Sequence, residues 1–177
     1  MNTEELKTYA CLFGSMDDIL RYLEEGNEND LLVKYLSTSP KHACFYAKYV
    51  INGRWRLGEK TIAKHPGYAY LYTLWIIEGR WRAGEKEIAK DPKYASLYAR
   101  DIIRRRWSEG EEAIAKDSFY AYFYAKDIIK GRFPKAEKIL VKDPIWGYNY
   151  ANKVIKGRFA RYKFLCMVAF YKFRNKV

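Results

Sequence analysis

Apolar and polar positions along the chain repeat with a period of 26 residues. The segment at 65–90 reads HPGYAYLYTLWIIEGRWRAGEKEIAK, and it aligns without a gap with 91–116, DPKYASLYARDIIRRRWSEGEEAIAK, and with 117–142, DSFYAYFYAKDIIKGRFPKAEKILVK. The segments that start at Ser39 and Asp143 continue the same register. A period of this length is typical of arrays in which each repeat is one supersecondary unit stacked on its neighbours.

Each repeat predicts two short helices. In the first, apolar residues recur at helical spacing, as in Ala69, Tyr72 and Ile76, and we expect about twelve residues of helix. This helix should end near a glycine, where a left-handed C-cap is easily adopted; the glycines are Gly53, Gly79, Gly131 and Gly157. The second should begin at an aromatic position, which is Trp55, Trp81, Trp107, Phe133 or Phe159, and continue through Ile62, Ile88, Ile114 or Leu140. Helices this short are unstable alone, so the repeats must stack.

Polar and small residues mark the boundaries and the contacts of these helices. An oxygen acceptor stands at four of the five expected N-caps, namely Ser39, Asp91, Asp117 and Asp143, and His65 occupies the fifth. Proline follows three of these acceptors, at a position where its missing N–H costs nothing, and Ser118 replaces the proline after Asp117. Inside the second helix stand Gly58, Gly84 and Gly110. Because a glycine within a helix costs about 1 kcal/mol relative to alanine, three in register predict a closely packed neighbour.

The pattern predicts an all-α fold, a short α-solenoid of stacked helix-turn-helix repeats with about twelve helices. We divide the chain into acidic N-terminal capping helices at 1–39, four 26-residue hairpins at 40–143, and a fifth repeat with a basic C-terminal capping helix at 144–177. In the first part, helices are expected at 2–13, 15–25 and 30–37. Atypical terminal units are what a solenoid needs to cover its exposed ends.

Several classes of function find no support in the residues. No apolar run approaches the roughly 18 residues of a membrane span, and acidic residues stand where a signal peptide would be basic. We therefore expect a cytoplasmic protein, in the host cytoplasm if it is viral, with no membrane association. Cys11, Cys44 and Cys166 lack any C-x-x-C pairing, which favours buried, reduced thiols.

Catalysis needs one distinctive constellation of residues, whereas a repeat places the same side chain in several equivalent sites. The four glutamates Glu59, Glu85, Glu111 and Glu137 are more simply partners of the arginines Arg54, Arg80, Arg106, Arg132 and Arg158. His42 and His65 do not have metal-ligand spacing. We expect no catalytic residue, no metal and no cofactor.

The formal charge of +12 is distributed unevenly. Residues 1–39 hold three basic and eight acidic side chains, whereas 144–177 hold eight basic and none acidic. The first hypothesis is that the basic half binds an acidic protein surface, since complementary potential accelerates encounter. The candidate residues are Arg104, Arg105, Arg106, Lys156, Arg158, Arg161 and Lys163. Arg105 replaces the turn glycine without an evident folding benefit, although the triplet at 104–106 is equally well read as a solvated turn.

Two other hypotheses remain open. A ladder of lysines could follow a phosphate backbone without reading bases; it consists of Lys64, Lys90, Lys116 and Lys142. The tyrosines Tyr46, Tyr72, Tyr98, Tyr124 and Tyr150 could stack on bases, but they recur in phase with the core and are better interpreted as packing residues. In the third hypothesis, the acidic end of one copy meets the basic end of another, which would build a head-to-tail homo-oligomer.

The pattern D-P-x-Y-A-x-x-Y-A-x-D-I-I-x-G-R-W-x-x-G-E, as at 91–111, resembles tandem helical repeats of uncharacterised proteins of large tailed bacteriophages. The resemblance covers roughly 39–162, with Arg105 and Ser118 as departures. It implies an α-solenoid and a viral origin, with a host protein as the partner that is blocked or redirected; it carries no established activity. More distantly, the architecture is similar to Sel1 and tetratricopeptide arrays, whose usual work is protein binding, a likeness of fold alone.

Overall fold

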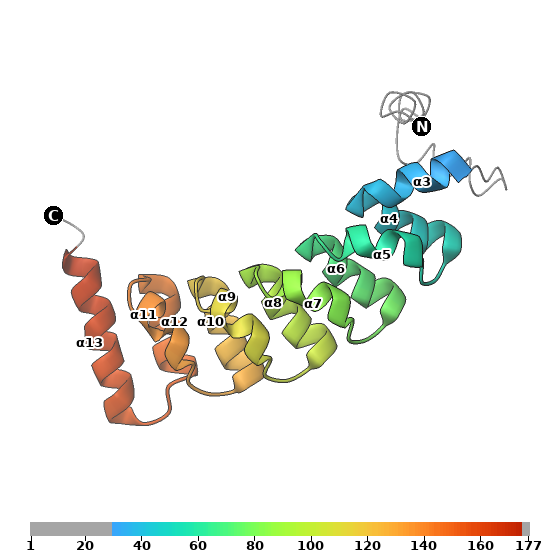
Figure 1. The fold of residues 1–177 in the computed structure, drawn as a ribbon. Coiled ribbons are helices and arrows are strands. Elements are labelled where there is room, and N and C mark those ends of the chain that lie inside the picture. The colour runs from blue at the N-terminus through green and yellow to red at the C-terminus, as the bar shows by residue number, and fades with distance from the viewer. Residues whose placement is uncertain (1–29, 175–177) are drawn as a thin grey trace. The chain divides into compact units, whose positions relative to one another are not determined.

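A computed structural model of the chain describes residues 30–174. Over this range the chain forms eleven α-helices joined by turns, without a β-strand, in repeated helix-turn-helix packing (Figure 1). The all-α, solenoid-like fold predicted from the sequence is therefore confirmed. The helices predicted at 2–13 and 15–25, together with Cys11, lie outside the described residues, and the helix predicted at 30–37 is α3 (Asp30–Thr38).

The chain divides into two compact units between residues 87 and 88. In unit 1, α3 precedes two hairpins. The first comprises α4 (Pro40–Tyr46), its continuation η1 (Ala47–Ile51) and α5 (Arg56–Ile62); the second comprises α6 (Pro66–Tyr72), η2 (Thr73–Ile77) and α7 (Arg82–Ile88), whose last residue is the first of unit 2. α4 packs against both α5 and α6.

Unit 2 contains three hairpins. The first comprises α8 (Pro92–Tyr98), η3 (Ala99–Ile103), η4 (Ser108–Gly110) and α9 (Glu111–Ile114). The second comprises α10 (Ser118–Phe123), η5 (Tyr124–Ile129) and α11 (Pro134–Leu140), and the third α12 (Pro144–Lys153) and α13 (Arg158–Arg174). α10 packs against α8 on one side and α12 on the other, so the first helices of successive hairpins form one continuous layer.

The predicted N-caps are present. The side chains of Asp91 and Asp117 accept hydrogen bonds from the backbone N–H groups of Tyr94 (3.0 Å) and Tyr120 (3.1 Å). Asp143 accepts from two N–H groups, and Ser39 from one at 3.5 Å. Each of these contacts satisfies a donor that the first turn of a helix leaves free.

In the first four repeats the first helix does run about twelve residues, but its second half is a π-helix, η1, η2, η3 or η5. The prediction of a left-handed glycine at its end is wrong at Gly53, Gly79 and Gly131; Gly157 has a positive φ (+94°), but it lies directly before α13 and not at the end of α12, whose C-cap is Val154. The left-handed residue is the one before the glycine position: Asn52, Glu78, Arg104 or Lys130. The glycine comes second because the π-helical turn closes with a backbone hydrogen bond in which the N–H of Gly53 reaches back to the carbonyl of Ala47, six residues earlier (3.1 Å).

The core is a layered stack of aromatic and aliphatic side chains. The five phased tyrosines, from Tyr46 to Tyr150, are at most 1 % exposed, and the aliphatic positions Ile62, Ile88, Ile114 and Leu140 are fully buried. Interpreting the tyrosines as packing residues is therefore confirmed, which leaves them unable to stack on bases. Tyr72 and Trp81 show how the layers meet, with ring centroids 5.0 Å apart.

The glycines inside the second helices make room for an indole ring. A Cβ on Gly84 would lie 2.6 Å from Cε3 of Trp81 and 3.1 Å from Cβ of Ala69. Gly58 and Gly110 stand against Trp55 and Trp107 in the same way, so the predicted close neighbour is found. In the fourth repeat the smaller ring of Phe133 accompanies alanine, Ala136, in place of glycine, and both are fully buried.

The last repeat departs from the others. Its second helix, α13, has 17 residues and begins at Arg158, one residue before the predicted aromatic start at Phe159. The ring that meets Tyr150 belongs to Phe164, at a centroid distance of 5.3 Å. None of the helices in the described range has the length and apolar content needed to cross a bilayer.

Candidate binding interface

Every repeat but the last in the described range joins an arginine to a glutamate five residues later. Nε and Nη2 of Arg54 donate to the two carboxylate oxygens of Glu59 at 2.8 and 3.0 Å. The same two-pronged pair forms between Arg80 and Glu85, Arg106 and Glu111, and Arg132 and Glu137. The interpretation of the glutamates as structural partners is thereby confirmed for these four pairs.

In three of these pairs, a tyrosine hydroxyl from the following repeat of the same unit also contacts the glutamate. The hydroxyl of Tyr72 accepts from the backbone N–H of Trp55 (2.9 Å) and donates to Glu59 (3.1 Å). Tyr124 and Tyr150 bind Trp107 and Phe133 in the same way, both at 2.7 Å. We call this arrangement of arginine, glutamate and next-repeat tyrosine the latch. The latch was not predicted from the sequence, although its members recur at fixed separations: the glutamate follows the arginine by 5 residues, and the tyrosine follows the glutamate by 13 and the tryptophan or phenylalanine by 17.

The latch explains the shifted pKa values of its members. The hydrogen bond from Arg54 holds the pKa of Glu59 below its usual value, against the opposing effect of partial burial. Burial raises the pKa of Tyr72 and of Tyr124 to about 12. At neutral pH the latch of Glu59 therefore contains an ionised glutamate, a charged arginine and a neutral tyrosine, and its net charge is close to zero.

The latch divides the predicted triplet at 104–106. Arg106 is bound to Glu111, a carboxylate whose side chain is only 3 % exposed, and so belongs to the fold. Arg104 and Arg105 are exposed in the turn between the two helices of their hairpin. The backbone there does not require glycine, since Gly53, Gly79 and Gly131 do not have a positive φ. Arg105 thus stands in place of glycine without conformational strain.

Arg104 and Arg105 belong to a row of cations that unit 2 carries on its hairpin turns, the turns inside each repeat. The row consists of Arg104, Arg105, Lys130, Lys156 and Arg158, which we call the turn cations; all are exposed, and none forms an ion pair within residues 30–174. The turns are neighbours because η3 packs against η5 and α10 against α12, and they follow one edge of unit 2, the lower edge in Figure 1. The matching positions of unit 1 hold Asn52 and Glu78, so the row is specific to unit 2.

The lysines of the nucleic-acid hypothesis occupy the other turns. Lys64, Lys90, Lys116 and Lys142 are exposed in the turns that link one repeat to the next. In an antiparallel helix pair these linking turns lie at the end opposite the hairpin turn. Within a hairpin of unit 2, Lys116 is therefore separated from Arg104 by the length of the helices, so the structure does not bring the two predicted sets together.

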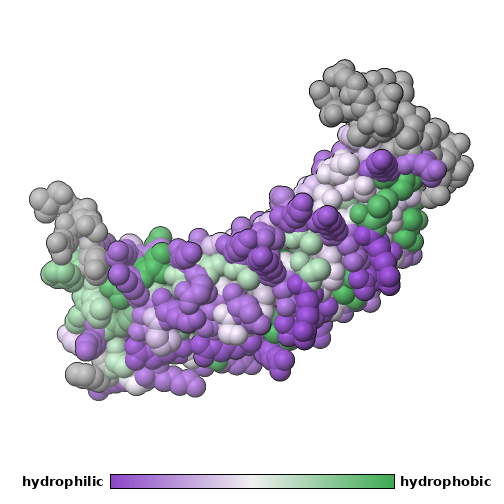
Figure 2. All heavy atoms as spheres, in the orientation of Figure 1, coloured by the Kyte–Doolittle hydropathy of each residue, from purple (hydrophilic) through white to green (hydrophobic). Residues whose placement is uncertain are grey.

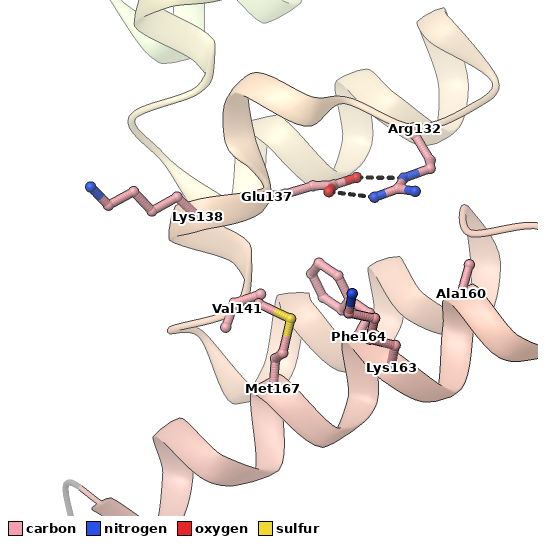
Figure 3. A pocket seen from close by; sticks show the side chains of 8 residues that line it. All are labelled: Arg132, Glu137, Lys138, Val141, Ala160, Lys163, Phe164 and Met167. Atoms are coloured by element: carbon pink, nitrogen blue, oxygen red, sulfur yellow. Dashed lines mark hydrogen bonds and ion pairs between the residues drawn. The ribbon is translucent and has the colours of Figure 1, made fainter.

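The remaining predicted residues, Arg161 and Lys163, are exposed on α13. Lys163 borders a cavity of about 520 Å³ between α11 and α13. Figure 3 shows Phe164 and Met167 rising from α13 toward Val141 and the Arg132–Glu137 pair. In the space-filling view, hydrophobic side chains gather over α13 among hydrophilic ones (Figure 2).

The thiols and histidines within residues 30–174 offer no reactive cluster. Cys44 is buried, as predicted, which raises the pKa of its thiol to about 12, whereas the prediction of a buried thiol is wrong for Cys166, which is exposed on α13. Burial lowers the pKa of His42. Within the described residues no group of three His, Cys, Asp or Glu side chains is placed to hold a metal ion.

Comparison of the chain with family models, with curated proteins and with solved structures gives no match. The candidate interface consists of three features of the structure: the turn cations, the linking-turn lysines and the cavity beside α13.

Proposed function

We propose that the protein is a non-enzymatic binding module whose second unit holds an acidic protein surface through the turn cations. The observation that supports this is the separation of two kinds of basic residue. Arg106 and Arg132 are neutralised in latches, whereas the turn cations follow one edge without a carboxylate of their own within the described residues.

The chemistry of the row suits carboxylates on a protein. Exposed cations accelerate encounter with a surface of opposite potential, and a guanidinium can bind a carboxylate with two parallel hydrogen bonds. Arg104, Arg105 and Arg158 provide such groups, and the two lysines add charge. A repeat scaffold presents these groups at regular intervals, which allows several weak contacts to act together.

The test uses two charge-reversal variants with the same change in net charge. Arg104→Glu/Arg105→Glu alters the hairpin-turn edge and leaves Arg106 in its latch; a glutamate at position 104 is compatible with the left-handed backbone, because Glu78 adopts it in another repeat. Lys116→Glu/Lys142→Glu alters the opposite edge of the same unit. Each full-length protein is used to capture partners from a bacterial lysate treated with nuclease.

We expect a partner that the arginine variant loses and the lysine variant retains. Equal loss in both variants would contradict a localised site, and loss in the lysine variant alone would move the site to the linking turns. The circular dichroism of both variants should match that of the original chain, since all four side chains are exposed.

A second candidate function is sequence-independent binding of nucleic acid. The exposure of all four linking-turn lysines in register supports it, and the neutralisation of the arginine ladder in ion pairs at the hairpin turns weakens it. Titration with unrelated oligonucleotides at two salt concentrations tests this function, because phosphate-backbone binding falls steeply with salt.

A third candidate function is self-assembly, in which the acidic end of one copy binds the basic end of another, and light scattering across protein concentration tests it. A role in blocking or redirecting a host protein rests on the phage-type repeats alone.

A further inference from the structure

The cavity between α11 and α13 has the chemistry of a protein-docking groove, and we propose that it takes an acidic amphipathic helix of the partner. This inference rests on the proposed function and deepens it, since it names the kind of segment that is bound and a second place of contact. It adds to the turn cations a pocket with an apolar floor and a basic margin.

The floor of the cavity is made of apolar side chains. Phe164 is 5 % exposed and Val141 3 %, while Met167 is 45 % exposed at the opening. A cavity of about 520 Å³ lies within the range of ligand pockets, roughly 300–1,000 Å³, and has room for a few side chains of a docking helix. Desolvating this floor supplies the affinity of such a contact, as buried apolar anchors do in protein interfaces.

At the margin of the cavity, a lysine stands at a position where the preceding repeats have a glutamate. Lys163 stands 26 residues after Glu137, at the position that holds a glutamate in the four preceding repeats. Glu137 itself is bound by Arg132 and accepts from Tyr150 (2.9 Å), so its charge is compensated. Lys138, also at the margin, and Lys163 have no carboxylate partner within the described residues. The cavity therefore offers positive charge to whatever enters it.

The apolar surface continues from the cavity along α13. Lys163, Met167 and Phe170 are spaced i, i+4 and i+7, which places them on one face of the helix. A second hollow, lined by these three residues and Cys166, adjoins the first along this face. Phe170 is 61 % exposed. A stripe of this length suits a helix lying in a groove, a recurring mode of recognition in which apolar residues at i, i+3, i+4 and i+7 act as anchors.

Charge complementarity selects the occupant. A helix with an apolar stripe fills the floor, and carboxylates on its flanks meet Lys138 and Lys163 at the margin. Phosphates of a nucleic acid would pair with the lysines, but they would leave Phe164, Val141 and Met167 facing a charged chain. The concave floor, sunk between two helices (Figure 3), also distinguishes the site from a helix that lies flat on a membrane.

The first experiment measures binding of fluorescein-labelled synthetic peptides to the full-length chain by anisotropy. One peptide is an amphipathic helix of leucine and glutamate, the second has the same composition in scrambled order, and the third replaces glutamate by lysine. We expect the first to bind, with an affinity that falls with salt, and the other two to bind at least about tenfold more weakly. Equal binding of the scrambled peptide would overturn the proposal.

Two matched pairs of variants locate the site on α13. Lys163→Glu and Lys172→Glu change the net charge equally, but only the first borders the cavity; we expect about tenfold weaker binding for Lys163→Glu and less than about twofold change for Lys172→Glu. Met167→Ser and Phe173→Ser both remove an exposed apolar side chain from the same helix, and only the first should weaken binding. All four positions are exposed, so the fold should persist in each variant.

The outcomes separate this proposal from the proposed function. Equal losses of peptide affinity within either pair would show that net charge or non-specific hydrophobic binding to α13 is responsible. Such a result would overturn the proposal of a docking groove. Binding to phosphatidylglycerol vesicles that is lost with Phe173→Ser and kept with Met167→Ser would assign the face to a membrane instead. If the peptides fail to bind while Arg104→Glu/Arg105→Glu still loses a captured protein, the acidic-partner function stands and the cavity is not its site.

Discussion

Gly84 and Trp81 allow a direct test of whether the large indole ring requires a glycine opposite it in the second helix of a repeat. Gly84→Ala adds a Cβ that would lie 2.6 Å from Cε3 of Trp81 and 3.1 Å from Cβ of Ala69. Carbon atoms pack best at about 3.5–4.0 Å, so the ring, which is 5 % exposed, has to move within a packed core. Overpacking costs about 1–3 kcal/mol, whereas alanine gains about 1 kcal/mol over glycine in a helix. The net expectation is a loss of up to about 2 kcal/mol in the free energy of unfolding.

The companion change, Trp81→Phe, removes the ring atoms that the new Cβ would meet. Alone it leaves a small cavity and costs about 1–3 kcal/mol. Combined with Gly84→Ala it reproduces the pair that the chain itself uses in the fourth repeat, Phe133 with Ala136. The double variant should therefore be more stable than the sum of the single effects predicts, by about 1–2 kcal/mol.

The assay is urea denaturation of the four proteins, followed by the helical circular dichroism signal. A change in midpoint at constant slope reports stability, whereas a change in slope would show that the two units no longer unfold together. Additive effects within about 0.5 kcal/mol, or a more stable Gly84→Ala protein, would refute the coupling of ring and glycine.

Three further predictions follow from the latch and from the two thiols in the described range. Tyr124→Phe leaves the buried N–H of Trp107 without its acceptor and should cost about 1–3 kcal/mol of unfolding free energy in urea; no change would mean that the N–H finds another partner. Since the pKa of Glu59 is lowered in the folded chain, its contribution is present above its unfolded pKa and is lost as pH falls through the folded value. The stability gap between the original chain and Glu59→Gln should therefore narrow from about pH 7 to about pH 3, and a constant gap would argue against the ion pair. In a Cys11→Ser chain, Cys166 should react with a thiol reagent at once and Cys44 only on unfolding, because burial raises the pKa of Cys44 to about 12; equal rates would contradict this.

Much of the fold could be predicted because the repeat displays its own periodicity. Phased tyrosines and isoleucines predict the buried faces, and Asp91 and Asp143 before proline predict where helices begin. The end of the first helix was predicted less well. Its left-handed residue is decided by the backbone hydrogen bond that closes the π-helical turn, and Glu78, Arg104 and Lys130 show no preference in their own chemistry for that conformation.

The candidate binding site likewise combines features that the sequence predicts with features that depend on the fold. The period, the helical class, the buried tyrosines and the excess of positive charge toward the C-terminus can all be read from the residues. Which cations are available depends on the folded chain, because a charge is neutralised by contacts that the backbone creates: Arg106 meets Glu111 across a turn, and the hydroxyl of Tyr124 reaches the same latch from the next repeat. The cavity beside α13 likewise depends on how two helices stand apart, since an apolar residue such as Phe164 has the same local pattern whether it lines a groove or fills a core.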